Sequence, residues 1–193
     1  MEKNFFSGFE ASVEAIIKKF GELEKKQDAI LQKNREFIRD CAKAIRFLHI
    51  GDLESAEKIL ESLKKRVKGF SEAEDFENIS NSALQEFVEF CVVLNAFKKE
   101  PLPSIKELQV NEISYLNGYA DATGEMRRAM QISLKNGDIA AAEYYFTVMD
   151  KIYDLLMSIR FSSSLAGDLK RRQDVARGQI EHARSELLRA QVR

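Results

Sequence analysis

The sequence predicts an all-α protein, a single-domain bundle of six to seven helices with an unusually long N-terminal helix. Apolar residues recur every three or four positions through most of the chain, which is the spacing of amphipathic helices. Two Pro and nine Gly are too few turn residues for a fold built from many short strands. A length of 193 residues corresponds to about one domain, so we treat residues 1–193 as one unit.

The first helix is expected from Asn4 to about Leu48, since no proline interrupts it. At 1.5 Å per residue, roughly 45 helical residues would extend for about 65 Å. One small bundle cannot cover a helix of that length, so part of it should protrude or contact another subunit. Gly51 should end this helix and Asp52 should cap the next, because glycine suits the left-handed position after a helix and aspartate suits an N-cap.

The remaining helices follow from the same spacing and from similar stop signals. The expected elements are a second helix at 53–67, a polar connection at 71–81, a third helix at 82–97, and further helices at 111–135, 138–161 and 168–191. Pro101 and Pro103 should end the third helix, which is apolar on most sides. Gly137 and Asp138 repeat the stop and cap of the earlier junction, while residues 105–110 are ambiguous.

Composition and charge exclude several classes of protein. Thirty Lys and Arg against 31 Asp and Glu give a formal net charge of −1, so any basic surface must be local. Cys41 and Cys91 are too few for a disulfide scaffold, and we expect both to be reduced core residues of a cytoplasmic protein. The sequence contains neither a long apolar run nor a signal-peptide pattern, which predicts no membrane partner.

Four acids are the candidate reactive groups, because the chain has only two histidines and none of the common nucleotide-binding or hydrolase motifs. Glu86 and Glu89 share one face of an otherwise apolar helix, where two like charges are costly unless a cation or proton compensates. Asp121 and Glu125 share one face of a second helix. Gly118, one turn earlier, is expected to leave space beside Asp121.

If these two helices lie side by side, the four carboxylates converge. Hard oxygen ligands without His or Cys are what Mg²⁺ or Mn²⁺ prefers. Such an ion can activate water and stabilise a phosphodiester under in-line attack. The alternative is that the acids form salt bridges with Arg127, Arg128 or lysines, and spacing alone does not decide between the two.

A basic stripe along the first helix is the candidate nucleic-acid-binding surface. It consists of Arg35, Arg39, Lys43, Arg46 and His49, at steps of three or four residues. Nucleic-acid phosphates can follow such a face. The alternative is a solvated face paired with acids, although only Glu36 and Asp40 share this stretch.

Four segments together resemble the translin family. They are LQEFVE at 84–89, YLNGYADATGE at 115–125, AIRFLHIGD at 44–52 and LKRRQDVAR at 169–177. The similarity covers nearly the whole chain in the same order. It is strongest to the catalytic branch, translin-associated factor X (TRAX), and suggests a prokaryotic, archaeal-type relative.

This resemblance implies a seven-helix fold that assembles into a hollow octamer and binds RNA or single-stranded DNA. In the TRAX branch it implies a Mg²⁺-dependent endoribonuclease, whose acidic positions fall on Glu86, Glu89, Asp121 and Glu125. We therefore expect these four to be catalytic residues that hold Mg²⁺ (or Mn²⁺), with the basic stripe holding single-stranded or frayed RNA without reading its sequence. One chain with both features should form a homo-octamer. The alternative is a non-catalytic cage that binds single-stranded RNA or DNA.

Overall fold

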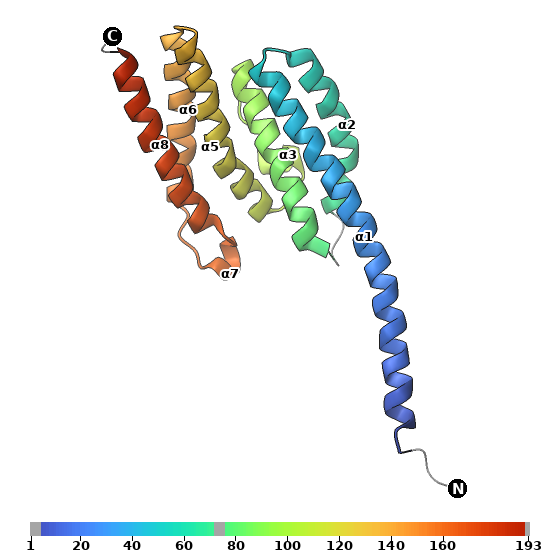
Figure 1. Cartoon of the computed structure of the whole chain (residues 1–193). Coiled ribbons are helices and arrows are strands. Elements are labelled where there is room, and N and C mark those ends of the chain that lie inside the picture. Colours follow the sequence, from blue (N-terminus) through green and yellow to red (C-terminus); the bar gives the residue numbers. More distant parts are fainter. Residues whose placement is uncertain (1–4, 72–75, 192–193) are drawn as a thin grey trace.

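The computed structural model describes residues 5–71 and 76–191, and every regular element in these ranges is a helix (Figure 1). The helices are α1 (Ser7–His49), α2 (Leu53–Ser71), α3 (Glu77–Lys98), α4 (Ile105–Leu108), α5 (Glu112–Lys135), α6 (Ile139–Met157), α7 (Ser163–Ala166) and α8 (Leu169–Gln191). Two of them, α4 and α7, are single turns of four residues, so six long helices make the bundle. The all-α prediction is confirmed.

The helices α3 and α5 lie side by side in the middle of the bundle (Figure 1). On one side α1 and α2 pack against α3, and on the other α6 and α8 pack against α5. The central position of α3 follows from its sequence, because it is apolar on most faces and must be covered all round. Its Cys91 and the Cys41 of α1 are buried and free, as expected of core cysteines.

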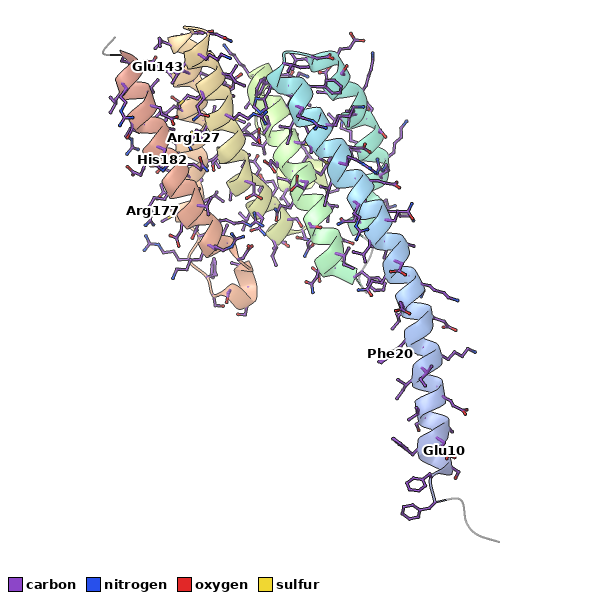
Figure 2. The ribbon with its side chains drawn as sticks, in the orientation of Figure 1. Glu10, Phe20, Arg127, Glu143, Arg177 and His182 are labelled. Atoms are coloured by element: carbon purple, nitrogen blue, oxygen red, sulfur yellow. The ribbon has the colours of Figure 1, made fainter. Side chains whose placement is uncertain are left out.

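The N-terminal half of α1 stands clear of the other helices (Figures 1 and 2). The helix has 43 residues, and none of residues 5–33 is buried. Phe9 and Phe20 in this half are 70% and 63% exposed. The prediction that part of the first helix protrudes is therefore correct. None of the helices in the described ranges is long and apolar enough to cross a membrane.

The two glycine–aspartate junctions have the predicted geometry. Gly51 and Gly137 adopt φ values of 82° and 76°, where a side chain would be strained. The Oδ1 atoms of Asp52 and Asp138 each accept a backbone N–H bond from the following helix, at 3.0 and 2.9 Å. These caps turn the chain sharply and set α2 against α1 and α6 against α5.

Several boundaries differ from the sequence-based expectation: α1 begins at Ser7 rather than Asn4, and α2 ends at Ser71 rather than at 67. Helix α3 begins at Glu77, so the expected polar connection at 71–81 is partly helical, and its residues 72–75 lie outside the described ranges. The ambiguous stretch at 105–110 contains α4, which Ser104 starts with a capping box. Helix α6 ends at Met157, four residues before the expected end.

Candidate functional site

The two pairs of acids face each other across the contact between α3 and α5. A Cβ atom added at Gly118 of α5 would lie 2.5 Å from the Cβ of Val88 and 2.6 Å from the carbonyl oxygen of Gln85 on α3. The backbones of these helices therefore approach closely just beside the acids. Gly118 serves this packing, and the expected open space next to Asp121 is filled by α3.

Each acid of α5 is held by a side chain from a distant helix. Arg172 of α8 donates to both carboxylate oxygens of Asp121, and Gln85 donates to Oδ2 at 2.7 Å. His49 of α1 lies 2.5 Å from Glu125, measured between Nε2 and Oε2. Arg128 is 3.7 Å from the same carboxylate oxygen.

The acids of α3 have no such partners. Within residues 5–71 and 76–191, Glu86 and Glu89 make no hydrogen bond or ion pair, and both are half-buried. Burial, and then the charges of Glu86, Asp121 and Glu125, raise the pKa of Glu89 to about 9. Burial and the charge of Asp121 also raise the pKa of Glu86. The crowded acids therefore disfavour one another's ionisation, and Glu89 keeps its proton to higher pH than an ordinary glutamate.

The pKa values of the α5 acids reflect the same balance. Burial raises the pKa of Asp121, although the Arg172 charge and hydrogen bond partly oppose that shift. Burial also acts to raise the pKa of Glu125, but the hydrogen bond and charge of His49 outweigh it, so this pKa is lowered. Glu125 is therefore the compensated member of the cluster, and Glu89 is the least compensated.

The chemistry of the four side chains fits a hard divalent cation, since they offer only oxygen ligands and a bound cation would replace the proton that crowding retains. Among the described residues, no three His, Cys, Asp or Glu side chains are already arranged as a metal-binding group. The free carboxylates of Glu86 and Glu89 are available as ligands. To bind an ion together with Glu86 and Glu89, Asp121 would have to weaken or break its contact with Arg172.

The salt-bridge partners suggested by the sequence are mostly not the ones observed. Arg127 pairs with Glu186 of α8 at 2.5 Å, across the α5–α8 contact. Arg128 reaches Glu125 only at the edge of ion-pair distance. Sequence reasoning missed Arg172 as the partner of Asp121. A signal was present, because Arg172 lies beside the buried seam of α8 that includes Leu169 and Gln173.

The basic stripe divides into an exposed part and a buried end. The exposed part consists of Arg35, Arg39, Lys43 and Arg46. None of these four side chains forms an ion pair or hydrogen bond with any residue that the structure describes. The nearby acids are engaged elsewhere, since Glu36 accepts a bond from Gln32 at 3.2 Å and Asp40 pairs with Arg66 at 2.5 Å. Lys43 packs over the ring of Phe47, 5.6 Å from its centroid.

His49 does not continue the exposed stripe. Its side chain is only 3% exposed, and the ring packs edge-on against Phe97. Its Nδ1 is buried and has no hydrogen-bond partner among the residues that the structure describes. The helical spacing that suggested a phosphate-binding role instead directs His49 inward, to Glu125. The C-terminal end of the basic helix thus enters the acid cluster.

Solved structures with the same fold are all-helical proteins named C3PO. A chain of AfC3PO in a complex with duplex RNA is 35% identical, with a TM-score of 0.83 over 94% of this chain and 97% of that chain. Another crystal structure of AfC3PO gives 36% identity and a TM-score of 0.82 at the same coverage. Apo-NeC3PO, at 24% identity and a TM-score of 0.82, shares the fold over 92% of this chain and 96% of its own.

An archaeal protein is also similar in sequence. An uncharacterized protein of Methanocaldococcus jannaschii is 32% identical over 168 residues, which is 84% of this chain and 75% of that protein. No family model matches the chain. The identity to AfC3PO over nearly the full length, together with the shared fold, confirms the resemblance: the chain belongs to the translin family, as an archaeal-type relative of the TRAX-like C3PO proteins.

Proposed function

We propose that this protein binds RNA along the basic stripe of α1 and cleaves it at the acid cluster in a Mg²⁺-dependent endoribonuclease reaction. The observation that carries the proposal is the course of α1. Its unpaired cations Arg39 and Lys43 are exposed, and the same helix ends at His49, which contacts Glu125. A backbone held along α1 would thus be led toward the acids.

The chain's own residues would divide the work. Arg35, Arg39, Lys43 and Arg46 would neutralise phosphates without reading bases. The four acids Glu86, Glu89, Asp121 and Glu125 would hold Mg²⁺, or Mn²⁺ in its place. When bound, such an ion supplies a Lewis acid that activates water and offsets charge on the phosphate. His49 would fix the orientation of the Glu125 carboxylate.

The substrate class is RNA, with single-stranded or frayed RNA as the preferred form. Support for RNA comes from the 35% identical AfC3PO, which was solved in a complex with duplex RNA. Because that complex contains a duplex, both strand states belong in the assay. Contacts to phosphates also allow single-stranded DNA to bind, since such contacts do not require a 2′-hydroxyl.

We also propose that the working form is a homo-oligomer, an octamer if it follows the family resemblance. The support in this chain is the protruding half of α1, which exposes Phe6, Phe9, Ile17 and Phe20. A single helix with so much exposed apolar surface gains stability when another subunit covers it. An enclosed assembly would place the acid cluster where only a threaded or short RNA could reach it.

The test is cleavage of end-labelled single-stranded and duplex RNA with Mg²⁺, with Mn²⁺ and with EDTA. The wild-type protein should cleave only with a divalent ion, and Glu89→Gln should reduce cleavage at least about a hundredfold while RNA still binds. Glu61→Gln, an exposed change on α2, is the matched control and should cleave normally. Cleavage that survives EDTA or Glu89→Gln would overturn the assignment.

A non-catalytic RNA-binding cage is the second candidate. The observation that favours it is that Asp121 and Glu125 are already paired with Arg172 and His49. In that case RNA would bind with an affinity that falls steeply as salt rises, but no divalent ion would produce cleavage. The same assay separates the two candidates.

A further inference from the structure

Arg172 forms hydrogen bonds with two acids, one in the acid cluster and one at its exposed rim. Its Nη1 donates to both oxygens of Asp121, which belongs to the acid cluster. Its Nε donates to Oδ1 of Asp168 at 3.1 Å, and Asp168 is the more exposed of the two acids. Only 16% of the Arg172 side chain is exposed. The guanidinium therefore bridges the cluster and its rim.

The charge of Arg172 acts on most of the cluster. It opposes the rise in pKa of Glu86, Glu89 and Asp121, although burial still raises all three. The guanidinium is permanently protonated and is fixed on α8, outside the two helices that carry the acids. It thus occupies the place of a counter-cation for carboxylates that would otherwise repel one another.

Asp168, the second acid that Arg172 holds, is also bonded to α5, one turn before Asp121. Asn117 donates from Nδ2 to Asp168 at 3.3 Å, and its own Oδ1 is buried without a partner. Asn117 is only 6% exposed. A guanidinium that left Asp121 could keep its hydrogen bond to Asp168, so Arg172 would not be left unpaired.

From this arrangement we propose that Arg172 is an exchangeable counter-cation, which neutralises the acid cluster when it is empty and gives up Asp121 to an incoming divalent ion. The proposal rests on the proposed metal-dependent function and adds a regulatory element to it. Arg172 and the ion compete for Asp121, so Arg172 lowers the affinity of the cluster for metal. The competition also keeps the empty cluster from destabilising the bundle.

The test is Mn²⁺ binding in the absence of RNA. The electron paramagnetic resonance signal of the free ion measures how much Mn²⁺ remains unbound. Arg172→Gln should bind Mn²⁺ roughly tenfold more tightly than wild type, because one unit charge is removed at close range in a partly buried site. Arg172→Lys keeps the charge but cannot bridge both acids. Its Mn²⁺ affinity should lie between those of wild type and Arg172→Gln. Arg171→Gln is the matched control, since Arg171 pairs with Asp168 but not with Asp121. It should bind Mn²⁺ within about twofold of wild type.

Two further measurements give the proposal independent readouts. The thermal midpoint should rise more on Mn²⁺ addition in Arg172→Gln than in wild type, because that variant lacks its internal cation. In the wild-type protein, the Nε–H resonance of Arg172 should shift on saturation with Mg²⁺, which requires no variant to fold.

The outcomes separate this inference from the proposed function. Equal or weaker Mn²⁺ binding by Arg172→Gln, with an unmoved Arg172 resonance, would overturn the inference and leave the nuclease proposal intact. Failure of wild type and every variant to bind Mn²⁺ would overturn both. Tighter binding by Arg172→Gln, with Arg171→Gln unchanged, would establish the exchange.

Discussion

His49 and Glu125 are joined across 76 positions of sequence by a contact of 2.5 Å between Nε2 and Oε2. The contact ties the end of α1 to the middle of α5. It connects the helix that carries the exposed cations to the cluster that carries the acids.

His49→Ala should destabilise the protein by about 1–3 kcal/mol at neutral pH, because Glu125 loses its hydrogen-bond partner in a partly buried place. The bond lowers the pKa of Glu125, so its contribution is present above the unfolded-state pKa and is lost as the pH falls through the folded-state pKa. The difference from wild type should therefore shrink toward acid pH. Urea unfolding at one protein concentration, with EDTA present, measures it. His49→Gln, whose amide can still donate, should cost less, and equal stability of wild type and His49→Ala would contradict the role.

Glu89→Gln should stabilise the metal-free protein at alkaline pH. Burial and the neighbouring acids raise the pKa of Glu89 from 4.5 to about 9, so the folded protein holds a proton that the unfolded chain releases. Wild-type stability should then fall as the pH rises from about 4.5 toward 9. We expect Glu89→Gln to exceed wild type by roughly 1–3 kcal/mol at pH 8 and to match it near pH 5. Denaturation across this range in EDTA is the measurement, with Glu61→Gln as the pH-independent control.

Helical periodicity and capping predicted the long helices because both act within a few residues of sequence. The start of α3 was placed too late because its first turns are polar. Their support is tertiary, since Asn111 donates to the side-chain oxygen of Asn81 at 2.6 Å and Ser114 donates to its backbone oxygen at 3.3 Å. Local pattern carries no information about such partners.

The candidate site was predictable as acids on two helix faces, but the side chains that hold the acids were not. Arg172 lies 51 positions from Asp121, and three consecutive basic residues begin α8. Which of the three turns inward depends on how α8 packs. His49 illustrates the same limit, because a step of three residues from Arg46 keeps it near the stripe while the surrounding bundle buries it.

Arg39→Gln should weaken RNA binding and reduce its salt dependence. If Arg39 contacts one phosphate, the slope of log K against log salt should become less steep by about 0.7–0.9, with the loss similar for different RNA sequences. Fluorescence anisotropy in EDTA, over a range of KCl concentrations, prevents cleavage from confusing the result. Lys58→Gln is the control, because Lys58 is exposed on α2 and is already paired with Glu54 at 2.6 Å. An unchanged slope for Arg39→Gln would remove this residue from the RNA surface.

Replacing Phe9, Ile17 and Phe20 together by serine should break the assembly into smaller species. These side chains are 63–70% exposed in the single chain, and covering each one fully would contribute about 1.5–3 kcal/mol. Sedimentation velocity should show a lower molar mass without loss of helical content. Phe161→Ser tests specificity, since Phe161 is equally exposed but lies far along the chain, after α6. A triple variant that sediments like wild type would show that this surface is not an interface.

Gly118→Ala should separate α3 from α5 at the level of the acids. The added methyl group would lie 2.5 Å from the Cβ of Val88, inside contact distance of a buried side chain that cannot swing away. Overpacking of this kind costs about 1–3 kcal/mol, which urea unfolding would detect.

Gly124→Ala is the matched change on the same helix, because a methyl group there has no neighbouring atom within 4 Å. It should stabilise α5 by about 0.5–1 kcal/mol through helix propensity alone. If the two helices set the spacing of the acids, Gly118→Ala should also lose Mn²⁺ affinity while Gly124→Ala keeps it. Equal stability of the two variants would mean that α3 and α5 can move apart at Gly118 without a cost in free energy. The spacing of the acids would then not depend on the close packing at Gly118.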